Sequence, residues 1–148
     1  YQEDEITLVY DTMWDGTRRL AEAIAKGIKE KDGKVTVKLR NIARSDINDV
    51  VTEIFKSKTV LFGSPTINRG ILNAMAALIE MAAGLRFRNK KAAAFGCYGW
   101  SGESVKVLNE MIRKAGFEVI HEGLRTMWQP GDDELAQAVQ FGRQIAGS

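Results

Sequence analysis

Short apolar runs alternate along the chain with longer segments in which apolar residues recur every three or four positions. The runs share β-branched or aromatic residues and turn-type residues at their ends, a pattern typical of buried strands. They lie at 6–10, 35–39, 59–63, 91–95 and 117–124. The periodic segments each predict a helix with one apolar face, and they lie at 16–31, 46–56, 72–83, 103–115 and 132–146. Five alternating strands and helices predict an α/β fold with a parallel sheet covered on both faces.

Turn and capping residues indicate where several of these helices begin and end. Ser45 is the expected N-cap of the helix at 46–56, and Asp132 opens the last helix in an acidic first turn. Gly84 and Gly116 end the third and fourth helices, as glycine commonly does. The three alanines at 92–94 leave little side-chain volume on the fourth strand, which predicts helices pressed close on both sides.

Composition indicates a globular protein with one domain, covering residues 1–148. Apolar residues make up 45% of the chain and charged residues 27%, and two prolines with no biased tract argue against a linker. The net charge is only +2. Its densest basic stretch, 86–91, is either a solvated connection or a docking patch for an acidic partner. Nothing else in the sequence supports a nucleic-acid partner.

The ends of the chain and its single cysteine bear on location. Cys97 alone excludes an internal disulfide, and no apolar stretch approaches the length of a membrane span. The acidic N-terminus is not a signal or transit peptide, so we expect a cytoplasmic protein with no membrane partner. The chain lacks an initial Met and a strand begins within about six residues. A fragment, an excised domain or a processed product is therefore expected.

Three segments that follow strands combine polar, glycine and aromatic residues, at 11–17, 63–70 and 96–102. They follow the first, third and fourth strands, which are neighbours in a sheet of order 2-1-3-4-5. In open α/β sheets ligands bind outside the carboxyl ends of the strands, where the strand order reverses. We therefore expect these three loops to converge on one cleft.

The first loop has the features of a phosphate site. Thr12 and Thr17 bracket Gly16 directly before a helix, whose free N–H groups and dipole favour an anion. The loop contains no Lys or Arg, which indicates capture by backbone and hydroxyl groups. It matches neither the P-loop nor the dinucleotide fingerprint. The alternative is that the two threonines are helix caps and Gly16 is a turn residue.

The other two loops suit a planar ring system. Tyr98 and Trp100 offer flat aromatic faces, and the glycines beside them allow close approach of the backbone. Polar groups for the edge of such a ring, together with one rigid proline, come from the other loop: Ser64, Pro65, Thr66 and Asn68. The alternatives are that the aromatic residues pack over a helix end and that the polar loop is an ordinary turn.

These motifs resemble the flavodoxin family over essentially the whole chain. The motifs are YDTMWDGT at 10–17, GSPTINRG at 63–70, AAFGCYGWSGE at 93–103 and MWQP at 127–130. More narrowly, they resemble the C-terminal flavodoxin-like domain of flavodiiron proteins, the rubredoxin:oxygen oxidoreductases and nitric oxide reductases. The resemblance implies a flavodoxin-like three-layer sandwich, with a five-stranded parallel sheet of order 2-1-3-4-5, and non-covalently bound flavin mononucleotide (FMN).

The resemblance also implies which residues hold FMN, with no catalytic residue and no metal ligand. The candidate cofactor-binding residues are Thr12, Met13, Trp14, Asp15, Gly16, Thr17, Ser64, Pro65, Thr66, Asn68, Gly70, Cys97, Tyr98, Gly99, Trp100 and Gly102. Three positions depart from the family pattern. Asp15 stands where glycine is frequent, Cys97 replaces a commoner serine, and Arg69 stands where asparagine is common. Arg69 could reach the flavin or face solvent.

The function implied by the resemblance is electron transfer, one electron at a time. The donor would be rubredoxin or a rubredoxin reductase, and the acceptor a diiron site that reduces oxygen or nitric oxide. That site belongs to an N-terminal β-lactamase-like domain, for which this chain has no ligand set; its only histidine, His121, lies on a predicted strand and is expected to be structural.

Other functions stay open on the sequence. A stand-alone flavodoxin and an NAD(P)H-dependent flavin or quinone reductase share the fold, although no dinucleotide motif is visible. A phospho-acceptor receiver domain would need a carboxylate at the end of the third strand, where this chain has Gly63-Ser64-Pro65.

Overall fold

The structure is a computed structural model that describes residues 3–10, 16–42, 45–64, 73–84, 90–98, 103–127 and 131–147. Its strands are β1 (Glu3–Tyr10), β2 (Thr36–Asn41), β3 (Ser57–Gly63), β4 (Lys91–Tyr98), β5 (Glu118–Val119) and β6 (Leu124–Met127). Its helices are α1 (Gly16–Lys31), α2 (Ile47–Lys56), α3 (Asn73–Gly84), α4 (Glu103–Lys114) and α5 (Asp132–Ala146). Within these residues, no helix combines the length and the apolar character that crossing a membrane requires.

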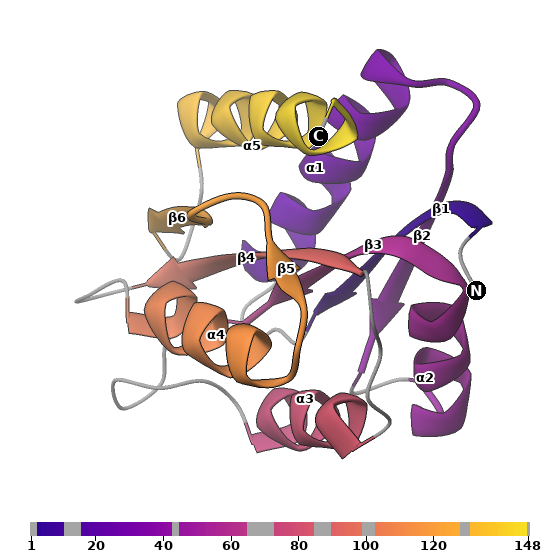
Figure 1. Cartoon of the computed structure of the whole chain (residues 1–148). Helices are drawn as coiled ribbons and strands as arrows, with labels where there is room; N and C mark the ends of the chain where they lie inside the picture. Colours follow the sequence, from indigo (N-terminus) through magenta and orange to yellow (C-terminus); the bar gives the residue numbers. More distant parts are fainter. Residues whose placement is uncertain are drawn as a thin grey trace.

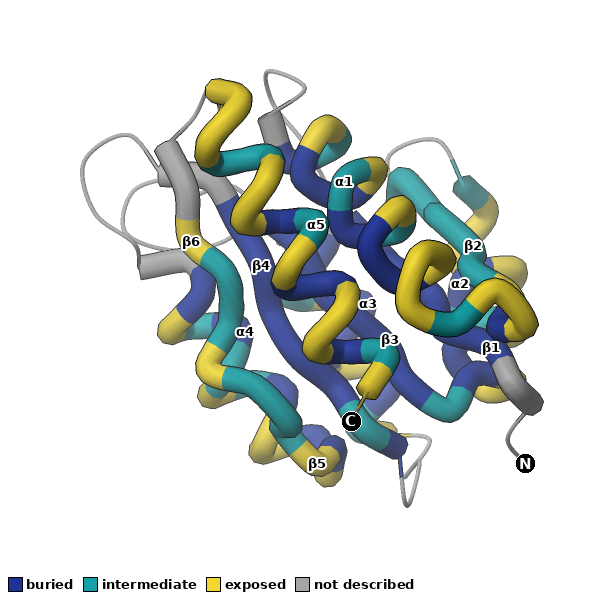
Figure 2. Tube along the Cα trace, turned by 90° about the horizontal axis from the view of Figure 1, so that it is seen from above, coloured by how far each residue is buried: buried dark blue, intermediate teal, exposed yellow. Residues whose placement is uncertain are grey.

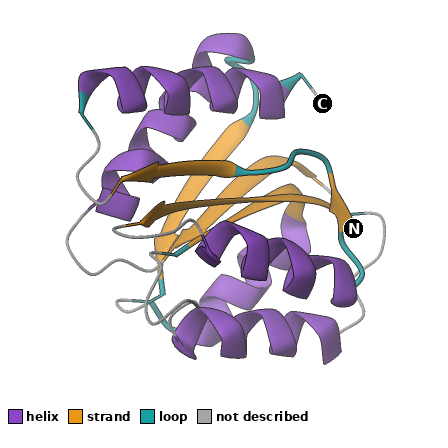
Figure 3. Cartoon of the chain, turned by 90° about the vertical axis from the view of Figure 1, so that its left-hand side faces the viewer, coloured by secondary structure: helices purple, strands orange, loops and turns teal. Residues whose placement is uncertain are grey.

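The strands form one parallel sheet in the order β2-β1-β3-β4-β5, and β6 also pairs with β4. Helices cover both faces, so the molecule has three layers (Figures 1 and 3). Helices α1 and α5 lie over one face, and α2, α3 and α4 lie over the other. The predicted fold class and strand order are confirmed.

Each face of the sheet carries its own apolar core, with the most deeply buried residues on the central strands (Figure 2). Phe62 on β3 faces α2, α3 and α4, whereas its neighbour Leu61 faces α1 and α5. On β4, Ala92 and Ala94 belong to the first core and Ala93 to the second, and all three are completely buried. The prediction of helices close to both sides of this strand is therefore confirmed.

Helices α1 and α5 approach each other closely enough to require glycine at their crossing (Figure 2). A Cβ at Gly142 would lie within 3.0 Å of the carbonyl group of Ile24, and one at Gly27 would overlap the carbonyl of Val139. Real Cβ atoms do not approach backbone atoms so closely. The two glycines therefore set how near the second helix layer lies to the first.

The fifth strand differs from its prediction as one run over 117–124. Two short strands, β5 and β6, pair with β4 in place of one. Between them the four residues 120–123 stand opposite only Ala93 and Ala94 of β4, so the chain carries two extra residues here, although Ile120 still donates its N–H to the carbonyl of Ala92 at 3.0 Å. Gly123 accommodates the return with a φ of 110°, a conformation that favours glycine. Phe117 lies before β5 and packs edge-on against Phe62, with ring centroids 5.6 Å apart.

The cap of α2 also differs from its prediction. Asp46 is the N-cap, because its side chain accepts a hydrogen bond from the backbone N–H of Asn48 at 2.8 Å. The hydroxyl of Ser45 instead donates to the carbonyl of Asn41 at 2.8 Å, tying the end of β2 to the start of the helix. Gly116 follows α4 with a φ of 100°, in agreement with the predicted stop.

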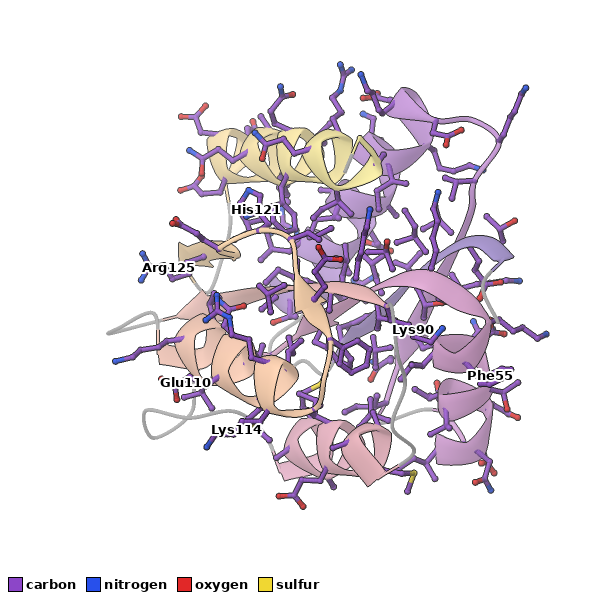
Figure 4. The ribbon with its side chains drawn as sticks, viewed as in Figure 1. Phe55, Lys90, Glu110, Lys114, His121 and Arg125 are labelled. Atoms are coloured by element: carbon purple, nitrogen blue, oxygen red, sulfur yellow. The ribbon has the colours of Figure 1, made fainter. Side chains whose placement is uncertain are left out.

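Polar residues are buried at the amino ends of β1 and β3. Glu5, Thr7 and Ser57 are 5%, 0% and 0% exposed, and the Ser57 and Thr7 hydroxyls contact the Glu5 carboxyl at 3.2 and 3.3 Å. Lys90 is 3% exposed and donates to the carbonyls of Phe55 and Ser57 at 2.7 and 2.6 Å (Figure 4). Of the basic stretch 86–91, Lys90 is thus a buried structural residue, not part of a solvated connection.

Candidate functional site

The carboxyl ends of β1, β3 and β4 lie next to one another in the sheet. Tyr10, the last residue of β1, pairs with Gly63, the last residue of β3, and Gly63 pairs with Phe95 of β4. Because the strands are parallel, the segments that follow them leave the same edge of the sheet. The expected juxtaposition of the three strand ends is confirmed, and it lies where the strand order reverses between β1 and β3.

The structure describes five of the candidate cofactor-binding residues: Gly16, Thr17, Ser64, Cys97 and Tyr98. The others lie outside the described residues, so their roles stay predictions; they are Thr12, Met13, Trp14, Asp15, Pro65, Thr66, Asn68, Gly70, Gly99, Trp100 and Gly102. Arg69 also lies outside the described residues.

Thr17 combines deep burial with an unused hydroxyl. It is the second residue of α1 and is 1% exposed, and its Oγ1 atom has no hydrogen-bond partner among the described residues. The first N–H groups of a helix have no partner within the helix, and the helix dipole is positive at this end. The first turn of α1 contains no acidic residue. A hydroxyl donor, free N–H groups and a positive dipole fit an anionic group such as a phosphate.

Ser64 is the first residue after β3 and is completely buried. Its backbone N–H donates to the carbonyl of Phe95 at 3.2 Å, which holds it against β4. The residue before it, Gly63, lies against the ring of Phe95, and a Cβ there would fall within 3.0 Å of three ring carbons. The start of the second candidate loop is therefore fixed by both backbone and side-chain contacts.

Cys97 and Tyr98 belong to a strand, although the sequence placed them in the loop after it. β4 runs to Tyr98, three residues beyond the predicted end at Phe95. The extension has a partner in β6, whose residues Thr126 and Met127 pair with Cys97 and Tyr98. β4 therefore continues three residues past Phe95, the register partner of the last residue of β3.

His121 has the structural role that the sequence suggests. It lies between β5 and β6, and its Nδ1 atom accepts a hydrogen bond from the N–H of Gly123 at 3.0 Å. The ring proton is therefore on Nε2, which lies 2.9 Å from Oε1 of Gln144 and donates to it. The ring also meets Phe141 edge-on, with centroids 4.6 Å apart. In the described part of the chain, no cluster of three His, Cys, Asp or Glu residues is placed to hold a metal ion.

Two grooves in the described structure lie away from the candidate residues. One, of about 410 Å³, lies between α4 and β6 and is lined by Asn109, Arg113 and Arg125, among others. Figure 4 shows Arg125 and Glu110 on this side of the molecule. The other, of about 430 Å³, lies between α1 and β2. Neither is lined by any of the candidate cofactor-binding residues.

The sequence model of the flavodoxin family, described as "Flavodoxin", matches residues 8–142. The anaerobic nitric oxide reductase flavorubredoxin of Escherichia coli O1:K1 is 49% identical over 146 residues, which are 99% of this chain and 30% of that protein. Among solved structures, the rubredoxin oxygen:oxidoreductase of the anaerobe Desulfovibrio gigas superimposes with a TM-score of 0.91 at 32% identity, covering 98% of this chain and 36% of that one. The flavodiiron protein of Giardia intestinalis gives 0.90 at 28% identity, covering 98% and 36%.

These matches agree with the strand order and with the helices on both faces of the sheet. They also confirm the predicted resemblance to flavodiiron proteins. The matches are consistent with this chain being a fragment of such a protein. The chain spans 30% of the length of the curated relatives that it matches. The family model covers most of the sequence, so the family of this chain can be assigned without those longer proteins. The chain belongs to the flavodoxin family.

Proposed function

We propose that this chain binds FMN non-covalently and uses it to pass electrons one at a time. One observation carries the proposal. The hydroxyl of Thr17 is buried without a partner among the described residues at the start of α1, the helix that follows β1 in the chain. An unsatisfied buried hydroxyl costs stability unless a ligand supplies its partner. A terminal phosphate would supply that partner, and the N-terminus of α1 would stabilise its charge.

In this proposal each described residue has a task. Thr17 donates a hydrogen bond to a phosphate oxygen, and the first N–H groups of α1 bind the same group. Ser64 and the end of β4 form the wall against which the flavin ring lies, with Thr12, Met13, Trp14, Trp100 and the other candidate residues completing the site. FMN supplies the one-electron chemistry, and the protein orients it and sets its potential through hydrogen bonds and charge.

The wider role that we propose is transfer of electrons within a longer protein. Two of the similar proteins are named a nitric oxide reductase and an oxygen oxidoreductase, and a third is named a flavodiiron protein. By analogy with them, the chain would take electrons from rubredoxin or a rubredoxin reductase. It would deliver them to a diiron domain of its parent protein, which reduces nitric oxide or oxygen. Residues 1–148 would then act as the single flavin domain of that protein.

The proposal is tested by comparing FMN with riboflavin, which lacks the phosphate. We expect the purified chain to retain FMN through desalting and to quench its fluorescence. Thr17→Val should weaken FMN binding by about tenfold or more, the effect of losing a hydrogen bond to a charged group. The same change should leave riboflavin affinity unaltered. Thr17→Ser, which keeps the hydroxyl, is the matched control and should bind FMN nearly as well as the original chain.

The outcomes separate the phosphate assignment from the cofactor assignment. If Thr17→Val binds FMN as tightly as Thr17→Ser does, Thr17 does not hold the phosphate. If the folded chain takes up no FMN at all, the cleft binds another ligand and the proposed function is wrong. Stepwise anaerobic reduction of the FMN-loaded chain then tests electron transfer. Rapid oxidation of NADH by the same preparation would favour the reductase alternative.

A further inference from the structure

We propose that Phe95 is a positioning residue for the flavin site, acting through the glycine at position 63. The inference rests on the proposed function and extends it to a residue of the core. Phe95 contacts neither solvent nor a described cavity, and it is completely buried on the α1 side of the sheet. Its task is to fix where the ends of β3 and β4 lie relative to each other.

The ring of Phe95 occupies the volume that a side chain at position 63 would take. Gly63 and Phe95 are register partners on adjacent strands. A Cβ on Gly63 would lie within 3.0 Å of Cδ2, Cε2 and Cζ of the ring. Gly63 is therefore required by close packing across the strand pair, because its φ lies outside the left-handed region that favours glycine.

The backbone of Phe95 makes a second contact to the same segment. Its carbonyl accepts the hydrogen bond from Ser64 N–H at 3.2 Å, so one residue of β4 holds both Gly63 and Ser64. Ser64 is a candidate cofactor-binding residue, and Cys97 and Tyr98 follow Phe95 after a single glycine. Phe95 thus lies between the starting points of the second and third candidate loops.

The ring also connects these loops to the phosphate end of the site. Phe95 packs in the same core as Tyr10, the last residue of β1, and Leu20 of α1. Leu20 lies three residues after Thr17 on that helix. Close-packed cores transmit changes of a few tenths of an ångström because side chains have no free volume into which to move. A displaced Phe95 ring would therefore disturb the core that holds the end of β1 and the first turns of α1, as well as Gly63 and Ser64.

The test combines a methyl group at position 63 with a smaller residue at position 95. Gly63→Ala should weaken FMN binding by about tenfold, which is about 1.4 kcal/mol, and should shift the midpoint potentials and visible absorption maxima of the bound flavin. Gly63→Ala with Phe95→Leu should restore affinity and spectrum toward the original values, because leucine lacks the ring carbons that meet the methyl group. Gly63→Ala with Phe62→Leu is the matched control. Phe62 is also completely buried but lies in the opposite core, so this pair should show no rescue.

Each outcome decides the inference. Rescue by Phe95→Leu alone supports it. Equal effects of the Phe95 and Phe62 changes, or an affinity and spectrum unaltered by Gly63→Ala, would overturn it. If Gly63→Ala does not fold, Phe95→Leu and Phe62→Leu are compared as single changes. The inference then requires a changed potential only in Phe95→Leu, at similar losses of stability. If the unaltered chain binds no FMN, the proposed function itself fails, whereas FMN binding with unaffected variants refutes the positioning role alone.

Discussion

Replacing Glu5 with glutamine should make the protein more stable at neutral pH, although it removes a buried acidic group. The Glu5 carboxyl is buried next to that of Glu53 on α2, and hydrogen bonding between the two shifts both pKa values. Arg40 donates to Oε1 of Glu53 at 3.1 Å, whereas the buried Oε2 atom has no donor among the described residues. Two ionised carboxylates cannot bond to each other, so a proton on Glu5 supplies the missing donor. The two carboxyls therefore titrate apart, and Glu5 holds its proton to a higher pH than Glu53 does.

The causes of the pKa shifts agree with this assignment. Burial raises the pKa of Glu5 above its ordinary value of 4.5, and the hydrogen bond and negative charge of Glu53 raise it further; Ser57 and Thr7 lower it in part. Burial opposes the ionisation of Glu53 as well. The hydrogen bond from Glu5 and the charge of Arg40 outweigh that effect, so the pKa of Glu53 falls below 4.5. The pKa of Glu5 therefore rises and that of Glu53 falls because the two carboxyls share one hydrogen bond.

The direction of the pH dependence follows from counting protons. In the unfolded chain both groups titrate near 4.5, whereas the folded protein keeps one proton between the two shifted pKa values. Below pH 4.5 the unfolded chain binds more protons, so stability from this pair rises with pH. Above pH 4.5 the folded protein binds more, so the stability that Glu5 contributes is lost as the pH rises through its folded pKa. The contribution of the pair is therefore largest near pH 4.5.

Glutamine at position 5 offers an N–H donor to Glu53 at every pH, so the loss above pH 4.5 should disappear. The original chain loses about 1.4 kcal/mol for each unit by which the folded pKa of Glu5 exceeds 4.5. Glu5→Gln should be as stable as the original chain near pH 4.5 and more stable at pH 8 by that amount. For a chain of 148 residues, each 1 kcal/mol corresponds to a change in Tm of about 2–4 °C.

Urea unfolding followed by circular dichroism from pH 4.5 to 8 measures the difference. Other charged groups near the pair are Lys38 on β2 and Lys90. Burial lowers the pKa of Lys90, and the charge of Glu5 opposes this in part once Glu5 is ionised. The scan therefore stops at pH 8, before lysine titration complicates the comparison. Glu5→Ala, which leaves the Oε2 atom of Glu53 without a donor, should lose about 1–3 kcal/mol throughout. A difference between Glu5→Gln and the original chain that does not grow with pH would refute the shared proton.

Three further changes test other parts of the structure. Thr17→Val should raise the Tm of the FMN-free chain while it weakens FMN binding, because it removes an unsatisfied buried hydroxyl; a lower Tm would contradict this. Gly142→Ala should cost about 1–3 kcal/mol in urea unfolding, since its Cβ meets the backbone of α1, whereas Gly84→Ala, with open space around it, should cost nothing. Phe117→Ala should cost about 3–5 kcal/mol, because it leaves a cavity in the core beside Phe62, and a cost under 1 kcal/mol would show that this part of the core does not depend on the ring.

Periodicity predicted most of the fold because each buried element here has an uninterrupted apolar signal. It failed at 117–124, which reads as one strand although two extra residues interrupt the pairing with β4. The polar stretch His121-Glu122-Gly123 marks the break in the sequence, and Gly123 has a positive φ there. At 96–98, glycine and aromatic residues suggested a loop. Whether β4 continues there depends on β6, which a local pattern does not reveal.

Candidate site residues could be proposed from the sequence where a local motif follows a strand. Residues that act through packing with distant partners could not. Thr17 was identified because a hydroxyl beside a glycine before a helix is a local signal. The role inferred for Phe95 depends on its register with Gly63, which pairs residues more than thirty positions apart. Glu5 and Lys90 lie in segments that read as charged surface, yet tertiary contacts bury both. Buried charged residues with distant partners leave no periodic pattern in a sequence.

Three buried side-chain polar atoms among the described residues have no hydrogen-bond partner. The surroundings of each atom indicate a different explanation. Glu53 Oε2 faces a carboxyl that can carry a proton, so its partner is supplied within the protein. Asn109 Oδ1 belongs to a side chain that lines the 410 Å³ groove beside α4 and whose amide nitrogen donates to the carbonyl of Glu122 at 2.7 Å. Thr17 Oγ1 has neither a protonated neighbour nor a described groove, and it lies at the positive end of a helix where three strand ends meet. A ligand with an anionic group therefore accounts for the Thr17 hydroxyl better than any partner within the described structure.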